Sequence, residues 1–287
     1  MKITASMVND LRKKTGVGMM QCKKALTETN GDVDKAVDLL RKQGADVASK
    51  RADKAANEGA VALAIENNKA VIVELNCETD FVASSDDFKA LQQDAVNALL
   101  NNDIDSVEQL LTAKVGDLDI AGRIDEAMSK IGEKMSFKRV GSMQVGEGEI
   151  VYPYSHLGGR AGCLVKLSYE GDADTAELES LAKDIAMQLV AFDAVSIDES
   201  GVPAEIVEKE RAIYREQIEL EGRTKPEFID RQIDGRVRKF LSGICLLEQD
   251  FIRDTSVKVK AHLKAEAQRL GLSSLNVTEF IRFELGK

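Results

Sequence analysis

The stretch "VIVELNCETDFVASSDDF", residues Val71 to Phe88, decides how the first half of the chain is expected to fold. It opens with an apolar run, Val71 to Leu75, that is typical of a buried strand, and it continues past two serines that can cap a following helix. Between strand and helix, an acid and a large aromatic, Asp80 and Phe81, stand together in a short predicted turn. Only 5% of the residues are aromatic, so this placement requires an explanation.

The residues before this stretch complete a predicted hairpin. Val61, Leu63 and Ile65 alternate with other residues, which indicates one face of a strand. A turn is expected at Asn67-Asn68, and the second strand follows it. After the hairpin, the apolar spacing predicts a helix from about residue 85 to 100, and further helices at about 106 to 114 and 119 to 134.

A weak internal repeat relates this hairpin to a later part of the chain. A shift of 92 residues places Asp80 on Asp172 and Phe81 on Ala173, with the same order of strand, turn and helix. We therefore expect two related α+β modules, residues 55–140 and 141–200, each with a small antiparallel sheet covered by helices. The second copy makes its turn without an aromatic, which indicates that the scaffold alone does not require Phe81.

The remaining segments complete an α+β fold class. Residues 1–54 are predicted to form a three-helix module, similar to ubiquitin-associated domains, and a helical linker from about residue 46 to 58; Gly44 is expected to end the third helix. Residues 201–243 contain two long amphipathic helices and a short polar loop, which predicts a helical hairpin of the coiled-coil type. Residues 244–287 are expected to form a helix and then a strand that returns to the second module.

The charge and the apolar content of the chain point to a protein partner. The 287 residues carry a net charge of −10, and contact with nucleic acid relies on Lys and Arg that neutralise phosphates. No apolar stretch is long enough to span a membrane, and the first residues lack the pattern of a signal peptide, so we expect a cytoplasmic protein.

Cysteine and histidine spacing argues against a metal site and a bound cofactor. The four cysteines lie far apart, which favours buried free thiols, and the two histidines have no second histidine at helical or strand spacing. No phosphate-binding glycine loop and no hydrolase motif is present. The residues therefore do not indicate an enzyme.

Two stretches together resemble a known family. They are LRKKTGVGMMQCKKAL, Leu11 to Leu26, and ELNCETDFVAS, Glu74 to Ser84. Both are similar to the paired motifs of the elongation factor Ts family, although members often carry a basic residue where this chain has Ser84. The similarity continues in the same order through KIGE at 130–133, HLGGR at 156–160, GRVRKF at 235–240 and FIRFE at 280–284.

The resemblance implies a factor that binds elongation factor Tu carrying GDP, opens its nucleotide site and leaves when GTP enters. It implies that Asp80 and Phe81 intrude near the magnesium site of that partner, while Thr79 and Val82 hold the turn. It also implies contacts with the partner from a further set of residues: Arg12, Met19 and Met20 in the helical module, and Ile131, Gly132 and His156 elsewhere.

Other interpretations remain open at this stage. Phe81 could instead cover the core of the hairpin. Met19 and Met20 could pack inside, although adjacent helical residues point about 100° apart, so both are not expected to be buried in so small a module. His156 is more often a hydrogen-bonded histidine than a functional one. The rival function is an adaptor that binds its partner without changing nucleotide release, and the helical hairpin could join two copies as a homodimer or in a 2:2 complex.

Overall fold

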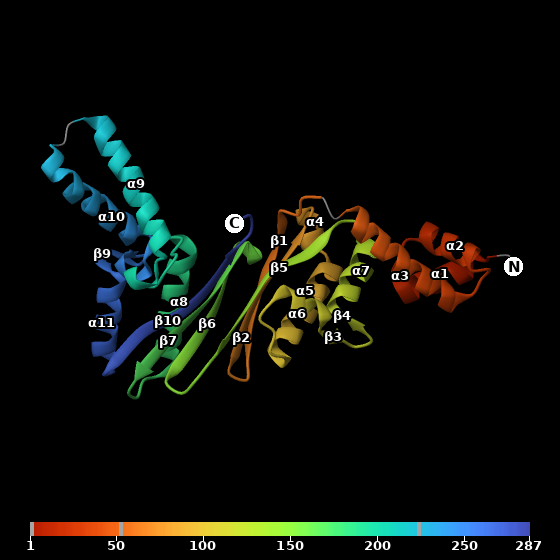
Figure 1. Cartoon of the computed structure of the whole chain (residues 1–287). Helices are drawn as coiled ribbons and strands as arrows, with labels where there is room; N and C mark the ends of the chain where they lie inside the picture. The colour runs from red at the N-terminus through yellow and green to blue at the C-terminus, as the bar shows by residue number, and fades with distance from the viewer. Residues whose placement is uncertain (1–2, 52–53, 223–224) are drawn as a thin grey trace. The chain divides into compact units, whose positions relative to one another are not determined.

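The computed structural model describes residues 3–51, 54–222 and 225–287, and for residues 44–50 it gives the backbone alone. Within these ranges the chain is a mixed helix and strand protein with helices at its N-terminus and antiparallel strand pairs (Figure 1), which confirms the expected α+β class. It divides into two compact units. The first unit contains Met1–Ser142, Leu157–Ala161 and Phe283–Lys287, and the second contains Met143–His156 and Gly162–Arg282. The finer division expected from the sequence stays a prediction.

Three helices begin the first unit: α1 (Ala5–Thr15), α2 (Met19–Glu28) and α3 (Val33–Lys50). They enclose a small core of their own, formed by Val8, Leu11, Val17, Cys22, Ala25, Leu26, Ala36 and Leu40. The prediction that the third helix ends at Gly44 is wrong, because α3 continues to Lys50. A glycine inside a helix costs only about 1 kcal/mol relative to alanine, and the alanine- and lysine-containing residues after it favour a helix. The rest of the predicted linker includes residues 52 and 53, which lie outside the described residues.

The first sheet has the strand order β1-β2-β5. Strands β1 (Glu58–Glu66) and β2 (Lys69–Cys77) form the expected antiparallel hairpin, with Asn67 and Asn68 at φ 47° and 64° in the turn. Strand β5 (Met135–Gln144) pairs on the other side of β2 and was not anticipated. The other elements of this unit are α4 (Asp80–Ala83), α5 (Asp86–Asn101), α6 (Val107–Thr112), β3 (Lys114–Val115), β4 (Leu118–Asp119) and α7 (Ile120–Ile131).

Strand β2 is buried along its whole length, and its two faces differ. Its odd-numbered residues from Val71 to Cys77 join the apolar core beneath α5 and α7. On the other face lies the fully buried carboxylate of Glu74. This arrangement makes β2 a rigid base for the residues that follow it.

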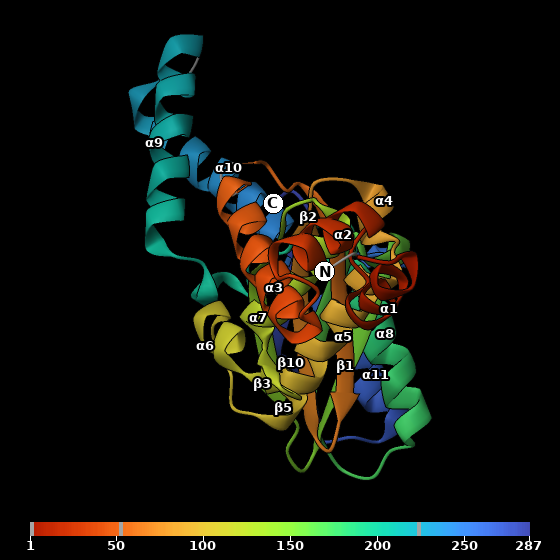
Figure 2. The same cartoon turned by 90° about the vertical axis from the view of Figure 1, so that its right-hand side faces the viewer.

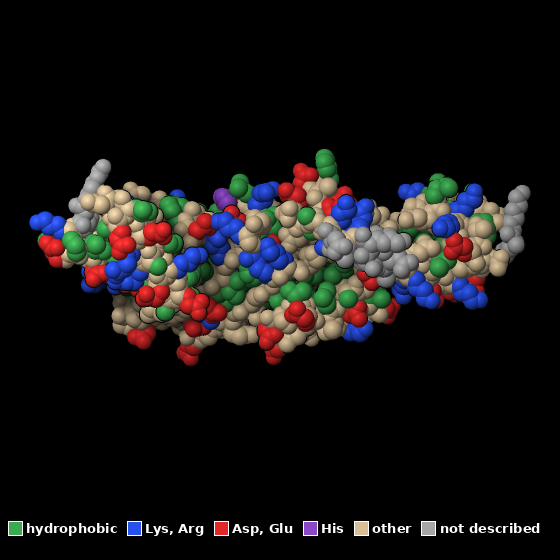
Figure 3. Space-filling view, turned by 45° about the horizontal axis from the view of Figure 1, so that its top comes forward, with side chains coloured by type: hydrophobic (Ala, Val, Ile, Leu, Met, Phe, Trp, Pro, Cys, Tyr) green, Lys and Arg blue, Asp and Glu red, His purple; other side chains and the backbone are tan. Residues whose placement is uncertain are grey.

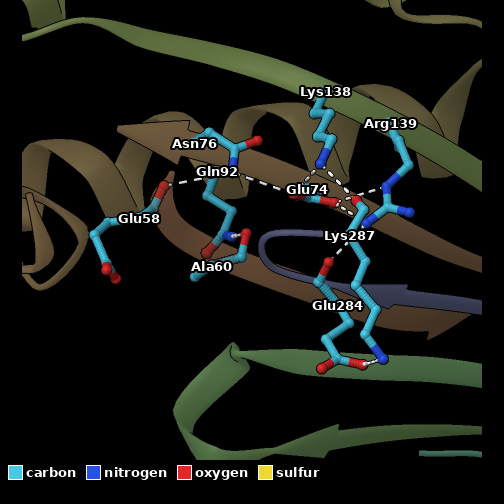
Figure 4. Close-up of polar contacts among 9 residues, drawn as sticks. All are labelled: Glu58, Ala60, Glu74, Asn76, Gln92, Lys138, Arg139, Glu284 and Lys287. Atoms are coloured by element: carbon cyan, nitrogen blue, oxygen red, sulfur yellow. Dashed lines mark hydrogen bonds and ion pairs between the residues drawn. The ribbon is translucent and has the colours of Figure 1, made fainter. Parts of the chain in front are cut away.

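The buried carboxylate of Glu74 is neutralised within the first unit (Figure 4). Arg139 Nε donates to it at 2.7 Å, and Lys138 Nζ lies 3.8 Å away. The same two cations donate to the end of the chain: Arg139 to the carbonyl oxygen of Glu284 at 2.9 Å, and Lys138 to that of Lys287 at 2.6 Å. A buried charge is tolerated only with such partners, so this network ties the last residues to the first sheet.

The second unit contains a sheet with the strand order β10-β7-β6, from β6 (Glu149–His156), β7 (Ala161–Glu170) and β10 (Ser274–Glu284). The last strand pairs with β7, as expected from the sequence. Helices α8 (Thr175–Ala191) and α11 (Val259–Leu270) supply apolar residues to its core. The ribbon of β8 (Asp250–Phe251) and β9 (Asp254–Lys258) was not predicted. The single 3-10 turns of this unit are η2 (Glu199–Gly201), η3 (Pro226–Phe228) and η4 (Leu246–Glu248), and η1 (Leu157–Gly159) belongs to the first unit.

The helical hairpin is formed by α9 (Ala204–Glu221) and α10 (Ile229–Ile244), in agreement with the prediction. Residues 223–224 of its loop lie outside the described residues. The two arms enclose apolar side chains, among them Ile218 and Ile233, and are joined by ion pairs. These pairs are Arg211–Asp234, Arg215–Asp230 and Arg236–Glu221, at 2.7 to 2.9 Å.

Two further expectations concern composition. All four cysteines are free and buried, as predicted. In the part of the chain that the structure describes, none of the helices combines the length and the apolar character that crossing a membrane requires.

Candidate functional site

The segment between β2 and α5 contains a single helical turn, α4, where the sequence indicated a short turn. Thr79 caps it: its backbone is extended, and its Oγ1 accepts a hydrogen bond from Val82 N at 3.4 Å. At the other end, Ser84 donates through both its backbone N and its Oγ to the carbonyl oxygen of Asp80, at 3.1 and 3.0 Å. Four residues are too few to give a helical period, so the pattern of apolar residues does not reveal this turn.

Helix α4 presents Phe81 to solvent and packs Val82 inward. The Phe81 side chain is 84% exposed, whereas Val82 is 7% exposed and belongs to the core beneath the hairpin. The alternative in which Phe81 covers that core is therefore wrong, because Val82 does so. Figure 3 shows, on the face that it draws, hydrophobic side chains among Lys, Arg, Asp and Glu side chains. Full burial of a phenylalanine would gain about 2 to 3 kcal/mol, and this gain is not realised in the free protein.

The residues just before α4 are fixed by the end of α7. Thr79 Oγ1 donates to Glu133 Oε2 at 3.0 Å, and the carboxylate of Glu78 accepts from Lys134 N at 2.7 Å. Within the segment, Cys77 Sγ donates to the carbonyl oxygen of Thr79 at 3.1 Å. Burial raises the pKa of the Cys77 thiol to about 11, so the thiol keeps the proton that it donates.

These hydrogen bonds bring Ile131 and Gly132 close in the fold to α4. Gly132 ends α7 with φ 82°, a left-handed conformation that favours glycine, and its N–H bonds the carbonyl oxygen of Met128 at 2.8 Å. Both residues are partly exposed. Ile131 and Gly132 directly precede Glu133 and Lys134, the two residues that hydrogen-bond Thr79 and Glu78 at the base of α4.

The N-terminal helices present a second exposed apolar surface. Met19 and Met20, at the start of α2, are 50% and 76% exposed, which confirms that they are not both buried. Met20 lies between two shallow hollows, one shared with residues of α1 and one along α2, where Lys23 lines both. Arg12 is exposed in the last turn of α1. Met19 and Met20 thus line an apolar surface, and Lys23 places a cation beside them.

His156 belongs to the second unit and is not part of the α4 cluster. It ends β6, is exposed, and stacks on Tyr154, whose hydroxyl lies 3.3 Å from His156 Nδ1. The next residue, Leu157, is 71% exposed with φ 49°. The exposure of Leu157 was not predicted from the sequence. The two glycines that follow, Gly158 and Gly159, indicate this exposure, because they permit a sharp turn that leaves the leucine side chain in solvent.

The arrangement of these residues defines a class of protein. Its exposed features are apolar side chains on fixed backbone, and no group of three or more His, Cys, Asp or Glu residues within the described ranges could hold a metal ion. Such surfaces recognise another protein, because fixed aromatic and methionine side chains bind with little loss of conformational freedom. The fold and the site thus define a protein that acts through contacts with a partner protein.

Comparison with known proteins identifies the family. Residues 78–287 match the family model "Elongation factor TS". Elongation factor Ts of Prosthecochloris aestuarii is 42% identical over 292 aligned positions, which cover 99% of each chain. The protein of the same name from Clostridium perfringens strain SM101 is 40% identical, over 99% of this chain and 93% of its own, and that of Chloroherpeton thalassium is 42% identical, over 100% and 99%.

The chain belongs to the elongation factor Ts family. Membership makes it a translation elongation factor with a function in nucleotide exchange, and it implies elongation factor Tu as the partner. The resemblance stated from the two sequence motifs is thereby confirmed.

Proposed function

We propose that the chain binds elongation factor Tu carrying GDP, speeds the release of GDP and leaves when GTP binds. The observation that carries this proposal is the 84% exposed Phe81 on a helical turn that is fixed at both ends. Family membership supports the choice of partner.

In this proposal Asp80 and Phe81 act at the magnesium and phosphate site of the partner. Mg²⁺ requires nearly ideal octahedral oxygen geometry and bridges protein and phosphate oxygens. An aromatic ring that enters beside these ligands displaces them, and a small displacement weakens nucleotide binding. The exposed carboxylate of Asp80 competes for polar groups of the same site.

Thr79 and Val82 give the aromatic ring its rigidity. The Thr79 cap contributes about 1 kcal/mol to the short helix, and Val82 anchors that helix in the core. Because α4 is already ordered, insertion of Phe81 loses little conformational entropy. The binding energy is then available to distort the partner.

The other exposed residues supply affinity. Arg12, Met19 and Met20 dock the N-terminal helices on the nucleotide-binding domain of the partner, since methionine adapts its shape to an apolar surface. Ile131 and Gly132 add contacts beside α4, and His156 contributes a contact from the second unit. The protein performs no covalent step, takes no cofactor and, with a net charge of −10, contacts protein and not nucleic acid. We place it in the cytoplasm, where translation elongation takes place.

The helical hairpin is proposed to join two copies, as a homodimer or within a 2:2 complex. Leu220 and Phe228, near its tip, are 80% and 49% exposed, although the arms already share a core. Changing both to Ser should lower the mass measured by light scattering, alone or with elongation factor Tu, without abolishing exchange. An unchanged mass would contradict this role.

The decisive experiment measures the release of a fluorescent GDP analogue from elongation factor Tu by stopped flow. We expect the protein to accelerate release strongly when Mg²⁺ is present. Removal of Mg²⁺ by a chelator should itself speed release and reduce the additional acceleration, because the protein then has no magnesium geometry to disturb. An adaptor docked elsewhere would bind the partner and leave the release rate unchanged, which would contradict the proposal.

A further inference from the structure

Glu78, directly before the cap of α4, joins three segments of the first unit. Its Oε1 atom accepts hydrogen bonds from Lys134 N at 2.7 Å and from a guanidinium nitrogen of Arg51 at 2.6 Å. The side chain is only 18% exposed. The Lys134 N–H first, and then the Arg51 hydrogen bond, lower the pKa of Glu78 below its usual 4.5, against the opposing effect of burial. Glu78 is therefore a charged, doubly bonded group at the base of α4.

Arg51 connects this group to the N-terminal helices. It follows α3, which begins among those helices and packs along α7 (Figure 1; Figure 2). Arg41, on α3, forms an ion pair with Glu126 of α7 at 3.6 Å. Helix α3 thus extends from the module that carries Met20 to the residues that hold α4.

Lys134 connects the same group to the end of α7. Its Nζ donates to the carbonyl oxygen of Lys54 at 3.0 Å, and the preceding Glu133 accepts from Thr79 at 3.0 Å. The Glu78 carboxylate accepts from Arg51, directly after α3, and from Lys134, after α7. Its loss would remove the link to Arg51 and one of the two links to the residues after α7, and would leave the Thr79–Glu133 hydrogen bond as the other.

We propose that Glu78 is a positioning residue for nucleotide exchange, which fixes Phe81 relative to α7 and to the end of α3. Docking of the N-terminal helices and insertion of Phe81 then occur as one rigid event, so the second contact is effectively intramolecular. This inference rests on the proposed function. A misplacement of about 1 Å at a reacting centre can cost on the order of 100-fold in rate, so a looser α4 should insert Phe81 less effectively.

The first test compares Glu78→Ala, Glu78→Gln and Arg51→Gln with the parent in the GDP-release assay, over a range of protein concentrations. Glu78→Ala should lower the release rate at saturation about tenfold and change the half-saturating concentration by less than about threefold, the pattern of an interaction made only in the transition state. Glu78→Gln keeps an acceptor for Lys134 N and should restore most of the rate. The saturating release rate of Arg51→Gln should be similar to that of Glu78→Gln.

The matched control is Asp184→Asn in the second unit. Asp184 lies on α8, away from α4 in the chain. It accepts from Arg253 at 2.9 and 3.1 Å and has a comparable exposure of 25%. We expect its release rate to equal that of the parent. A loss in Asp184→Asn as large as that in Glu78→Ala would overturn the assignment of a specific role to Glu78.

The second test asks whether Glu78 acts through Phe81. In the Phe81→Ala background, Glu78→Ala should cause no further loss of rate, whereas two independent contributions would multiply. If the losses of release rate in the two single variants multiply in the double variant, the inference about Glu78 is wrong and the proposed function stands. The same holds if Glu78→Ala releases GDP at the rate of the parent while Phe81→Ala is slow. A parent-like Phe81→Ala would overturn the proposed function and the inference with it. If Glu78→Ala does not fold, Glu78→Ser, which lacks the carboxylate and is too short to reach Lys134 N, replaces it in this comparison.

Discussion

The two copies of the internal repeat share a plan and differ where the first copy carries its candidate site. Strands β2 and β7 are both the middle strand of a three-stranded sheet, and each leads to a helix, α5 or α8. After β2 the chain inserts α4 and exposes Phe81. After β7 it makes only a short turn through Gly171, and Ala173, the residue aligned with Phe81, packs on the second core.

This difference separates what the scaffold requires from what has been added to it. A strand, a short connection and a capped helix suffice to cover one sheet, as the second copy demonstrates with Asp174 as its cap. The first copy makes the same connection longer, stabilises it with a separate helical turn and leaves an aromatic in water. Val82 of this turn belongs to the first core, whereas the exposed side chain of Phe81 adds nothing to it.

The largest expected effect concerns the linkage between nucleotide and protein. An exchange factor must bind nucleotide-free elongation factor Tu more tightly than the GDP-bound form, and reciprocity requires GDP to weaken its binding by the same factor. We expect a ratio on the order of 100-fold in a calorimetric titration at increasing GDP. Phe81→Ala should reduce this ratio, and Ala173→Phe should leave it unchanged. An affinity for elongation factor Tu that does not depend on GDP would show that Phe81 gives the first copy no function in nucleotide exchange that the second copy lacks.

The next largest effect separates docking of the N-terminal helices from insertion of Phe81. Met20→Ala should weaken binding to elongation factor Tu about tenfold, as expected for an exposed apolar anchor, and leave the saturating release rate near that of the parent. Ile65→Ala, which truncates a 45% exposed side chain near the tip of the β1-β2 hairpin, is the control and should change neither. Equal affinities of Met20→Ala and the parent would exclude the N-terminal surface from docking.

A smaller effect concerns the anchor of α4. Val82→Ala removes two methyl groups from the first core and should lower the free energy of unfolding by about 1 to 2 kcal/mol in urea titrations. Val195→Ala, at a 51% exposed position of the second unit, should lie within about 0.5 kcal/mol of the parent. If Val82→Ala proves as stable as the parent, α4 is not held by the core in the way described.

The smallest effect is a dependence of stability on pH at Glu78. The folded-state pKa lies below the usual 4.5, so the contribution of Glu78 is fully present above about pH 4.5 and is lost as the pH falls through the lowered pKa. The difference in unfolding free energy between the parent and Glu78→Gln should therefore shrink on acidification below pH 4.5. A difference that stays constant from pH 6 to pH 3 would show that the charge contributes nothing.

The sequence predicted the elements that obey a local rule. The Asn67-Asn68 turn, a serine cap for α5 and the two arms of the helical hairpin follow from backbone preferences and apolar spacing of nearby residues. The repeat pointed correctly to equivalent strands and to a turn where the two copies differ. Exposure of Phe81 followed from that comparison and not from the pattern around it.

What the sequence did not reveal depends on partners far along the chain. Helix α4 is too short to have a period, and its supports, Glu133 and Lys134, lie more than 50 positions from Glu78 and Thr79. Strand β5 carries charged residues and a glycine that weaken its pattern, and Arg139 within it is paired with the buried Glu74. Such pairings arise only when the sheet is assembled, so neighbouring residues give no signal of them.

The exposed aromatic side chain of the first copy is proposed to drive GDP release. Stopped flow can measure release of a fluorescent GDP analogue from elongation factor Tu with the parent, with Phe81→Ala and with Phe192→Ala, which truncates a 45% exposed phenylalanine of the second unit. We expect that Phe81→Ala folds and still binds the partner but loses most of the acceleration at saturating concentration, while Phe192→Ala matches the parent. Equal release rates for Phe81→Ala and the parent would contradict it.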